Sequence, residues 1–267
     1  AAVIAERVGE PYGTLVLTMA VTVIEVAVIP TIMLGENGVP TLARDTVFAV
    51  VMIVCNGLVG ICIMSGGFRY REQDIQATSA SVYLSVLIVL ATITLVLPNY
   101  TLTTPGPFYS NGQLVFVSVA TIILYGVFLY IQTMRHRDYF VGGNDPAEAH
   151  PASNRMLWTS VALLLLALVG VVALAKKFSV VIDAVAIEIG APPAFAGIVV
   201  ALLILLPESV AAIGAARRDQ LQRSINLALG SSLATIGLTI PAVSAAAIIL
   251  GKDLVLGLSP REMVLLA

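Results

Sequence analysis

Charged residues are scarce in this chain. Asp, Glu, Lys and Arg make up 11% of its 267 residues, whereas 58% of the residues are hydrophobic. A soluble domain usually carries about 25% charged residues. A water-soluble protein of this size could not cover so apolar a chain with polar surface. Long apolar runs separated by short charged patches are instead typical of a protein that spans a lipid bilayer.

Residue types that support catalysis and metal binding are also few. The two histidines, His136 and His150, both lie in a polar stretch, and the sequence contains no HExxH motif. Intramembrane enzymes need paired aspartates, a Ser/His pair or such a metal site, and no Asp or His lies within the long apolar runs. We therefore expect no enzyme activity and no cofactor. The net charge of -2, without a basic block, gives no reason to expect a nucleic-acid partner.

Seven apolar segments are long enough to cross roughly 30 Å of hydrocarbon, which takes about 20 residues. They lie near 13–34, 46–66, 78–97, 112–133, 157–175, 193–216 and 225–250, and an eighth begins near Pro260. Backbone groups in lipid need internal hydrogen-bond partners, and these runs lack the two-residue alternation of barrel strands. The sequence therefore predicts an all-α, polytopic membrane helix bundle.

The connections between these segments differ in positive charge. Connections on the side of the N-terminus hold nine Lys and Arg residues and those on the other side hold five. The positive-inside rule places the first set in the cytoplasm, and the uncharged connection 98–111 fits the external side. The longest polar stretch, 134–156, is predicted to be a cytoplasmic linker between two halves. The chain begins at Ala1 rather than Met and ends in an apolar run, so we expect a segment of a longer protein.

Two glutamates, Glu25 and Glu208, lie inside predicted spans. An acidic side chain at a helix centre costs about 2.5–3.5 kcal/mol on insertion scales, and such residues commonly mark ion or proton pathways. We therefore predict that both carboxylates bind a metal cation or protons. A protonated glutamate that bonds a neighbouring helix is the structural alternative.

Prolines beside both glutamates favour a cation site. Pro207 cannot donate the backbone hydrogen bond that the Leu203 carbonyl would accept, and Pro30 leaves the Val26 carbonyl free in the same way. Hard cations such as Ca²⁺ and Na⁺ take oxygen ligands. Val26 and Leu203 are therefore candidate backbone ligands, although a simple proline kink is equally compatible with the sequence.

The helix after each glutamate segment carries small and polar residues. Asn56 stands in the run MIVCNGLVG, and Ser231 and Ser232 stand in LALGSSLATIG. Their side-chain oxygens could complete the shell of a bound cation, which makes all three candidate supporting ligands. Close helix packing is the alternative, because small residues let helices approach each other.

The two glutamate segments also share an arrangement. A glycine precedes each glutamate by 11 or 12 residues, Gly13 before Glu25 and Gly197 before Glu208. By the count of spans, the two segments cross the membrane in opposite directions. Inverted repeats that place polar groups at the midplane are typical of secondary transporters. We predict a first half at 1–133, the linker at 134–156 and a second half at 157–267.

The segments GEPYGTLVLTMAVTVIEVAVI, ALLILLPESVAAIGAA and INLALGSSLATIGLTIPAV resemble the calcium/proton exchanger family. The resemblance is strongest to the ChaA-type sodium (potassium, calcium)/proton antiporters of the calcium/cation antiporter superfamily. It implies ten or eleven helices in two inverted halves, of which this chain lacks the first and the last few. It also implies that Glu25 and Glu208 bind the cation and exchange it for protons.

One motif departs from the family pattern. Val21-Thr22 and Ile204-Leu205 stand where Gly-Asn is usual before the glutamate, which puts calcium selectivity in doubt. The resemblance implies an antiporter in a bacterial inner membrane, with protons, small inorganic cations and lipid as its partners. The sequence leaves a sodium/calcium exchanger without proton coupling and a cation channel open as alternatives. It leaves both a monomer and a homo-oligomer open.

Overall fold

A computed structural model describes residues 40–135, 154–192 and 194–267, together with Thr22, Val23, Val26, Val28 and Ile29. Within these residues the regular structure is helical, apart from one isolated antiparallel bridge between Phe108 and Val255. Most of the predicted span 13–34 and most of the predicted linker 134–156 lie outside the described residues.

Three membrane-length helices come from the first half. The helix α3 (Leu42–Met52) continues through the π-helical segment η1 (Ile53–Leu58) into α4 (Val59–Tyr70). The helix α5 (Ala77–Ala91) continues through η2 (Thr92–Val96) into the short 3-10 turn η3 (Leu97–Tyr100). The helix α6 (Asn111–Tyr130) ends in the π-helical segment η4 (Ile131–Arg135). Ser110 and Gln113 form a capping box at the start of α6, which explains why that helix begins there.

The second half contributes one very long helix and several shorter ones. The order is α8 (Asn154–Glu188), α9 (Phe195–Ala216), α10 (Leu221–Ala234), η5 (Thr235–Thr239), α11 (Ile240–Leu250) and α12 (Pro260–Leu266). The segments α10, η5 and α11 form one continuous span, as α3, η1 and α4 do in the first half. Each of these two spans therefore contains a π-helical segment, and α5 and α6 also each run into one.

Five of the seven predicted spans are confirmed. The segments Leu42–Tyr70, Ala77–Tyr100, Asn111–Thr133, Phe195–Ala216 and Leu221–Leu250 are long and apolar enough to cross a membrane. The start of an eighth helix near Pro260 is also confirmed by α12.

The prediction for 157–175 is wrong at its C-terminal end. The helix α8 does not stop before Lys176 and Lys177 but continues to Glu188. Lysine is a good helix former, and no glycine or proline lies between Gly170 and Gly190. Gly190, with a left-handed φ of 64°, and Pro192 follow Glu188 and stop the helix. Lys176 and Lys177 therefore lie within a helix rather than in the predicted connection.

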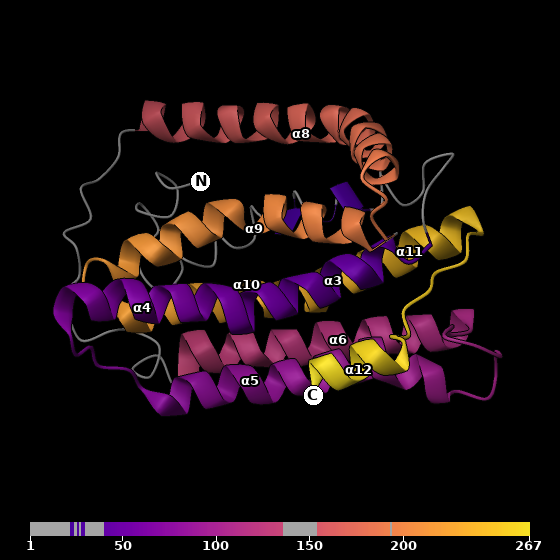
Figure 1. Ribbon diagram of the computed structural model, residues 1–267, viewed down its shortest axis with the longest axis horizontal. Helices are drawn as coiled ribbons and strands as arrows, with labels where there is room; N and C mark the ends of the chain where they lie inside the picture. The colour runs from indigo at the N-terminus through magenta and orange to yellow at the C-terminus, as the bar shows by residue number, and fades with distance from the viewer. Residues whose placement is uncertain (1–21, 24–25, 27, 30–39, 136–153, 193) are drawn as a thin grey trace.

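The helix α9 packs against helices from both predicted halves. It packs against α3 of the first half and α10 of the second, while α5 packs against α10 and α6 against α11. Figure 1 shows α8 beyond α9, and α5 and α6 on the opposite side of the molecule. The span Leu221–Leu250 is 61% buried along its most apolar window, against 28% for Asn111–Thr133. The central span is therefore the one that follows α9.

Connections from both halves meet at each end of the bundle. At one end, the Gln73 side chain donates hydrogen bonds to the Ala216 carbonyl and to Asp219. At the other end, the amides of Leu256 and Gly257 both donate to the Pro107 carbonyl. This pairing of connections agrees with the alternation of the predicted spans.

Candidate cation-binding site

The predicted site residue Glu208 lies past the middle of α9, directly after the intrahelical Pro207. Its side chain is buried, with 5% of the residue exposed, and it forms no ion pair with the described residues. The surrounding helix is strongly apolar, so an ionised carboxylate at this position carries a high free-energy cost of burial. Pro207 has no N–H, so the Leu203 carbonyl lacks its usual helical partner.

A hydroxyl from the neighbouring helix meets this carboxylate. Ser231 on α10 is buried and donates a hydrogen bond from its Oγ to Oε2 of Glu208. Two residues predicted from separate sequence runs are thus brought together. Because α9 and α10 pack along each other, the pair lies at a helix interface rather than at a lipid-facing surface.

Ser232, the next residue on α10, is fully buried, and its Oγ has no hydrogen-bond partner among the residues that the structure describes. Buried hydroxyls normally have a partner, and one without is often a place where a water or ion binds. One helical turn further on, Thr235 begins the segment η5 and is also buried. Segments of π-helix occur frequently at functional sites.

No hydrogen bond joins Glu208 to the predicted ligands Asn56, Leu203 and Val26 among the described residues. Asn56 lies in η1 with an exposed side chain, and its Nδ2 donates to the Met52 carbonyl of its own helix, 3.2 Å away. The side chain of Leu203 is 47% exposed, so only its backbone could serve the site. Val26 is half-buried. Glu25 lies outside the described residues, and its predicted role stays a prediction.

The described residues supply one carboxylate to this site. Within the described part of the chain, no group of three or more His, Cys, Asp and Glu side chains could hold a metal ion together. The local chemistry is therefore a single buried carboxylate with hydroxyl and carbonyl oxygens near it. Such a set suits proton binding directly, and it suits a hard cation when further oxygen ligands join it.

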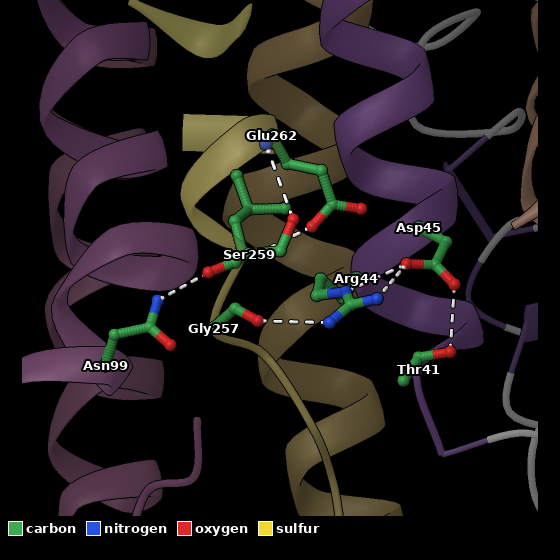
Figure 2. Close-up of polar contacts among 8 residues, drawn as sticks. Thr41, Arg44, Asp45, Asn99, Gly257, Ser259 and Glu262 are labelled. Atoms are coloured by element: carbon green, nitrogen blue, oxygen red, sulfur yellow. Dashed lines mark hydrogen bonds and ion pairs between the residues drawn. The ribbon is translucent and has the colours of Figure 1, made fainter. Parts of the chain in front are cut away.

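Sequence reasoning missed a second charged cluster, which Figure 2 shows. Asp45 on α3 is buried and forms an ion pair with Arg44, with 2.7 Å between Arg44 Nη2 and Asp45 Oδ1. Thr41 Oγ1 donates to Asp45 Oδ2 over 2.8 Å, and Arg44 Nη1 donates to the Gly257 carbonyl over 3.1 Å. The available signal was the Thr41-to-Asp45 spacing of four, which places both residues on one face of a helical turn.

A cavity of about 220 Å³ opens beside this cluster. It is lined from α3, from the start of α9 and from α12, and its two acidic lining residues are Asp45 and Glu262. The lining reaches Met52 and Ile53, where α3 passes into η1. The cavity therefore runs between the two halves from one end of the bundle toward its interior.

Comparison with known proteins agrees with this architecture. A family model described as sodium/calcium exchanger protein matches residues 1–134 and 159–267. The chain is 46% identical over 270 residues to the protein y4hA of Sinorhizobium fredii, covering 100% of this chain and 73% of that protein. It is 38% identical over 271 residues to the sodium-potassium/proton antiporter ChaA of Escherichia coli, covering 99% of this chain and 73% of that protein.

A solved structure shares the fold. The crystal structure of the H⁺/Ca²⁺ exchanger CAX matches with a TM-score of 0.70 at 15% identity, covering 98% of this chain and 67% of that chain. At 15% identity, this match is evidence of a shared fold only. It confirms the predicted class of helical membrane bundle, and the sequence matches confirm the resemblance on which the predicted family rested.

Proposed function

The chain belongs to the sodium/calcium exchanger protein family, and we propose that it is a secondary active transporter that exchanges Ca²⁺, Na⁺ or K⁺ for protons. Membership places it among integral membrane transporters rather than enzymes. Proton coupling is supported by the relative at 38% identity, which is named a sodium-potassium/proton antiporter.

The observation that carries the proposal is the buried Glu208 in contact with Ser231. A carboxylate within an apolar helix can be neutralised either by a proton or by a bound cation, because a charge without a partner is costly there. Both ligands would use the same oxygens. Competition for one carboxylate would therefore couple the cation flux to a proton flux in the opposite direction.

In the proposed site, Glu25 of the first half joins Glu208 of the second. Two carboxylates a few ångströms apart repel each other, so in the absence of a cation at least one would take up a proton. A hard cation bound between them would neutralise both charges. Ser231, Ser232 and the carbonyl of Leu203 are the proposed supporting oxygens from the second half. Val26 and Asn56 are the corresponding proposal for the first half.

Alternating access would follow from the two inverted halves, 1–133 and 157–267, joined by the linker 134–156. If one half rocks against the other, the shared site would face each side of the membrane in turn. We place the protein in a bacterial inner membrane, with the connections that carry Arg71 and Arg217 in the cytoplasm. Inward proton flow would then drive cation export.

The test uses the complete protein in everted membrane vesicles that carry a pH-gradient dye. Addition of Ca²⁺, Na⁺ or K⁺ should collapse the gradient, and the cation that does so is the substrate. Glu25→Gln and Glu208→Gln should abolish the response. Glu188→Gln is the matched control, because Glu188 is exposed at the end of α8, and it should respond like the unmodified protein.

Each failure points to a different part of the proposal. If no cation collapses the gradient while Na⁺-driven Ca²⁺ uptake is observed, the protein is a sodium/calcium exchanger, as the family description suggests. If both glutamine variants respond normally, the assignment of the site is wrong. Cation movement that proceeds without any counter-flux would instead identify a channel.

A further inference from the structure

We propose that Arg44 and Asp45 form a latch between the two halves, and that this latch must open before a cation can enter from that end of the bundle. The inference rests on the proposed function only for its role in transport. The latch itself is a contact in the structure and can be tested without any transport measurement.

Arg44 bonds to groups in both predicted halves of the chain. Arg44 Nε and Nη2 reach Oδ1 of Asp45 on the same helix, at 2.8 and 2.7 Å. Its Nη1 reaches across to the Gly257 carbonyl of the second half. The two side chains are 15% and 5% exposed, so the pair is largely shielded from solvent. The arginine fork can hold a carboxylate and a carbonyl at once, which a point charge would do less well.

The loop that accepts this arginine is held tightly from its other side. A Cβ at Gly257 would lie 2.8 Å from the Cβ of Pro107, so the loop packs directly on the 101–110 connection. Asn99 Nδ2 also donates to the Leu258 carbonyl over 2.9 Å, as Figure 2 shows. Arg44 therefore ties α3 to a loop that is itself fixed to the end of α5 and η3.

Asp45 connects the same latch to the helix that carries Glu208. A Cβ at Gly197 would lie 2.7 Å from the Cβ of Asp45 and 2.9 Å from its carbonyl carbon, so α9 touches α3 at this point. Gly197 and Glu208 lie 11 residues apart on one helix, about 16 Å by the rise per residue. A displacement of α9 that changes access to Glu208 would disturb the Asp45 contact.

The cavity described above lies between α3 and the start of α9, the two segments that would separate if the latch opened. Asp45 lines it at the end of the bundle, Met52 and Ile53 line it deeper, and Ala194 and Ile198 of the second half form the facing wall. Separating α3 from the start of α9 would widen this cavity toward solvent. With the latch closed, the guanidinium occupies the Asp45 carboxylate, one of the two carboxylates that line the cavity. Arg44 is thus a positioning residue that controls entry.

The test measures access to the cavity by thiol labelling in membrane vesicles. In the complete protein with all of its native cysteines, Cys55 and Cys62 among them, replaced by alanine, Met52→Cys places a single thiol in the cavity wall. A membrane-impermeant maleimide is applied from each face in turn. Adding Arg44→Gln should raise the labelling rate at least fivefold from the face where the 251–259 loop lies. Arg261→Gln, which removes an exposed arginine at the same end, should leave the rate unchanged.

A second variant covers the case in which Arg44→Gln does not reach the membrane. Arg44→Lys keeps the positive charge but loses the planar guanidinium that bonds the Asp45 carboxylate and the Gly257 carbonyl at once. It should therefore give an intermediate increase in the labelling rate. Labelling that is unchanged in the variants that reach the membrane overturns the latch. If Arg44→Gln is labelled faster while the unmodified protein shows no proton-coupled exchange, the latch is supported and the proposed function is overturned. The two failures are therefore distinguishable.

Discussion

Ser231 and Glu208 come from different helices, and the hydroxyl of the first donates a hydrogen bond to the buried carboxylate of the second. The sequence separates them by 23 residues and a turn that contains two arginines, Arg217 and Arg218. Their contact shows how the polar run on α10 is used. Its serine faces α9 at the level of the glutamate, so at least this part of the run does more than allow close packing.

The first prediction concerns this hydrogen bond. Ser231→Ala removes the donor and one candidate oxygen ligand. Hydrogen bonds to charged groups are worth about 1.5–3 kcal/mol, which corresponds to roughly a tenfold to hundredfold change in an equilibrium constant. We expect the apparent KM for the transported cation to rise by about tenfold or more in the vesicle assay. Ser244→Ala, which changes a buried serine in the same continuous span, is the control and should leave KM unchanged. Equal effects in both variants would contradict a specific role for Ser231.

A second prediction concerns the close approach of α9 to α3. Gly197→Val would place side-chain atoms where the Asp45 Cβ and backbone already lie, within 3.0 Å. Overpacking of this kind typically costs 1–3 kcal/mol. We expect a lower melting temperature in detergent for the purified protein. Gly214→Val on the same helix is the control, because a Cβ at Gly214 meets nothing within 4 Å. If both variants melt alike, the packing at Gly197 is not tight.

Much of the helical framework could be predicted because hydrophobic length is a strong signal in a membrane protein. Five spans follow from apolar runs of about 20 residues that end at turn or charged residues. The predicted end of α8 is wrong because a pair of charged residues, Lys176 and Lys177, follows the apolar run without interrupting the helix. Charge does not end a helix, whereas a glycine in the left-handed conformation followed by proline does, and Gly190 and Pro192 supply that signal.

The candidate site was predictable only in part. Glu208 and Ser231 stood out because an acid and a serine pair are unusual in apolar helices. Their direct contact could not be derived, because it depends on the rotation of α9 against α10. Asn56 occupies the corresponding run in the first half but has an exposed side chain in η1, where the π-helical turn shifts the register of the helix. Asp45 was missed because it lies at the very edge of a predicted span, where charges are normally solvated.

A third prediction concerns the hydrogen bonds of Gln222, at the end of the bundle where the α4–α5 and α9–α10 connections meet. Gln222 is buried, donates from Nε2 to Ser79 Oγ and Asn226 Oδ1 at 3.0 and 2.9 Å, and accepts from the Gln76 amide at 2.8 Å. Gln222→Leu would remove these three hydrogen bonds. Each buried polar group left unsatisfied lowers the free energy of unfolding by about 1–3 kcal/mol. We expect a clear drop in melting temperature. Gln220→Leu is the control, because the Gln220 side chain makes no capping hydrogen bond to α10. A variant at Gln222 as stable as the control would show that this network contributes little.

The last prediction concerns orientation in the membrane. Arg69, Arg71, Arg217 and Arg218 lie at one end of the bundle, and the uncharged 101–110 connection lies at the other. The positive-inside rule therefore places the arginine end in the cytoplasm. With all native cysteines, Cys55 and Cys62 among them, replaced by alanine, a cysteine at the fully exposed Leu102 should react with impermeant maleimide only in right-side-out vesicles. A cysteine at Arg218 should react only in everted vesicles. The reverse pattern would invert the orientation, and the Arg44 latch would then guard cytoplasmic rather than external entry.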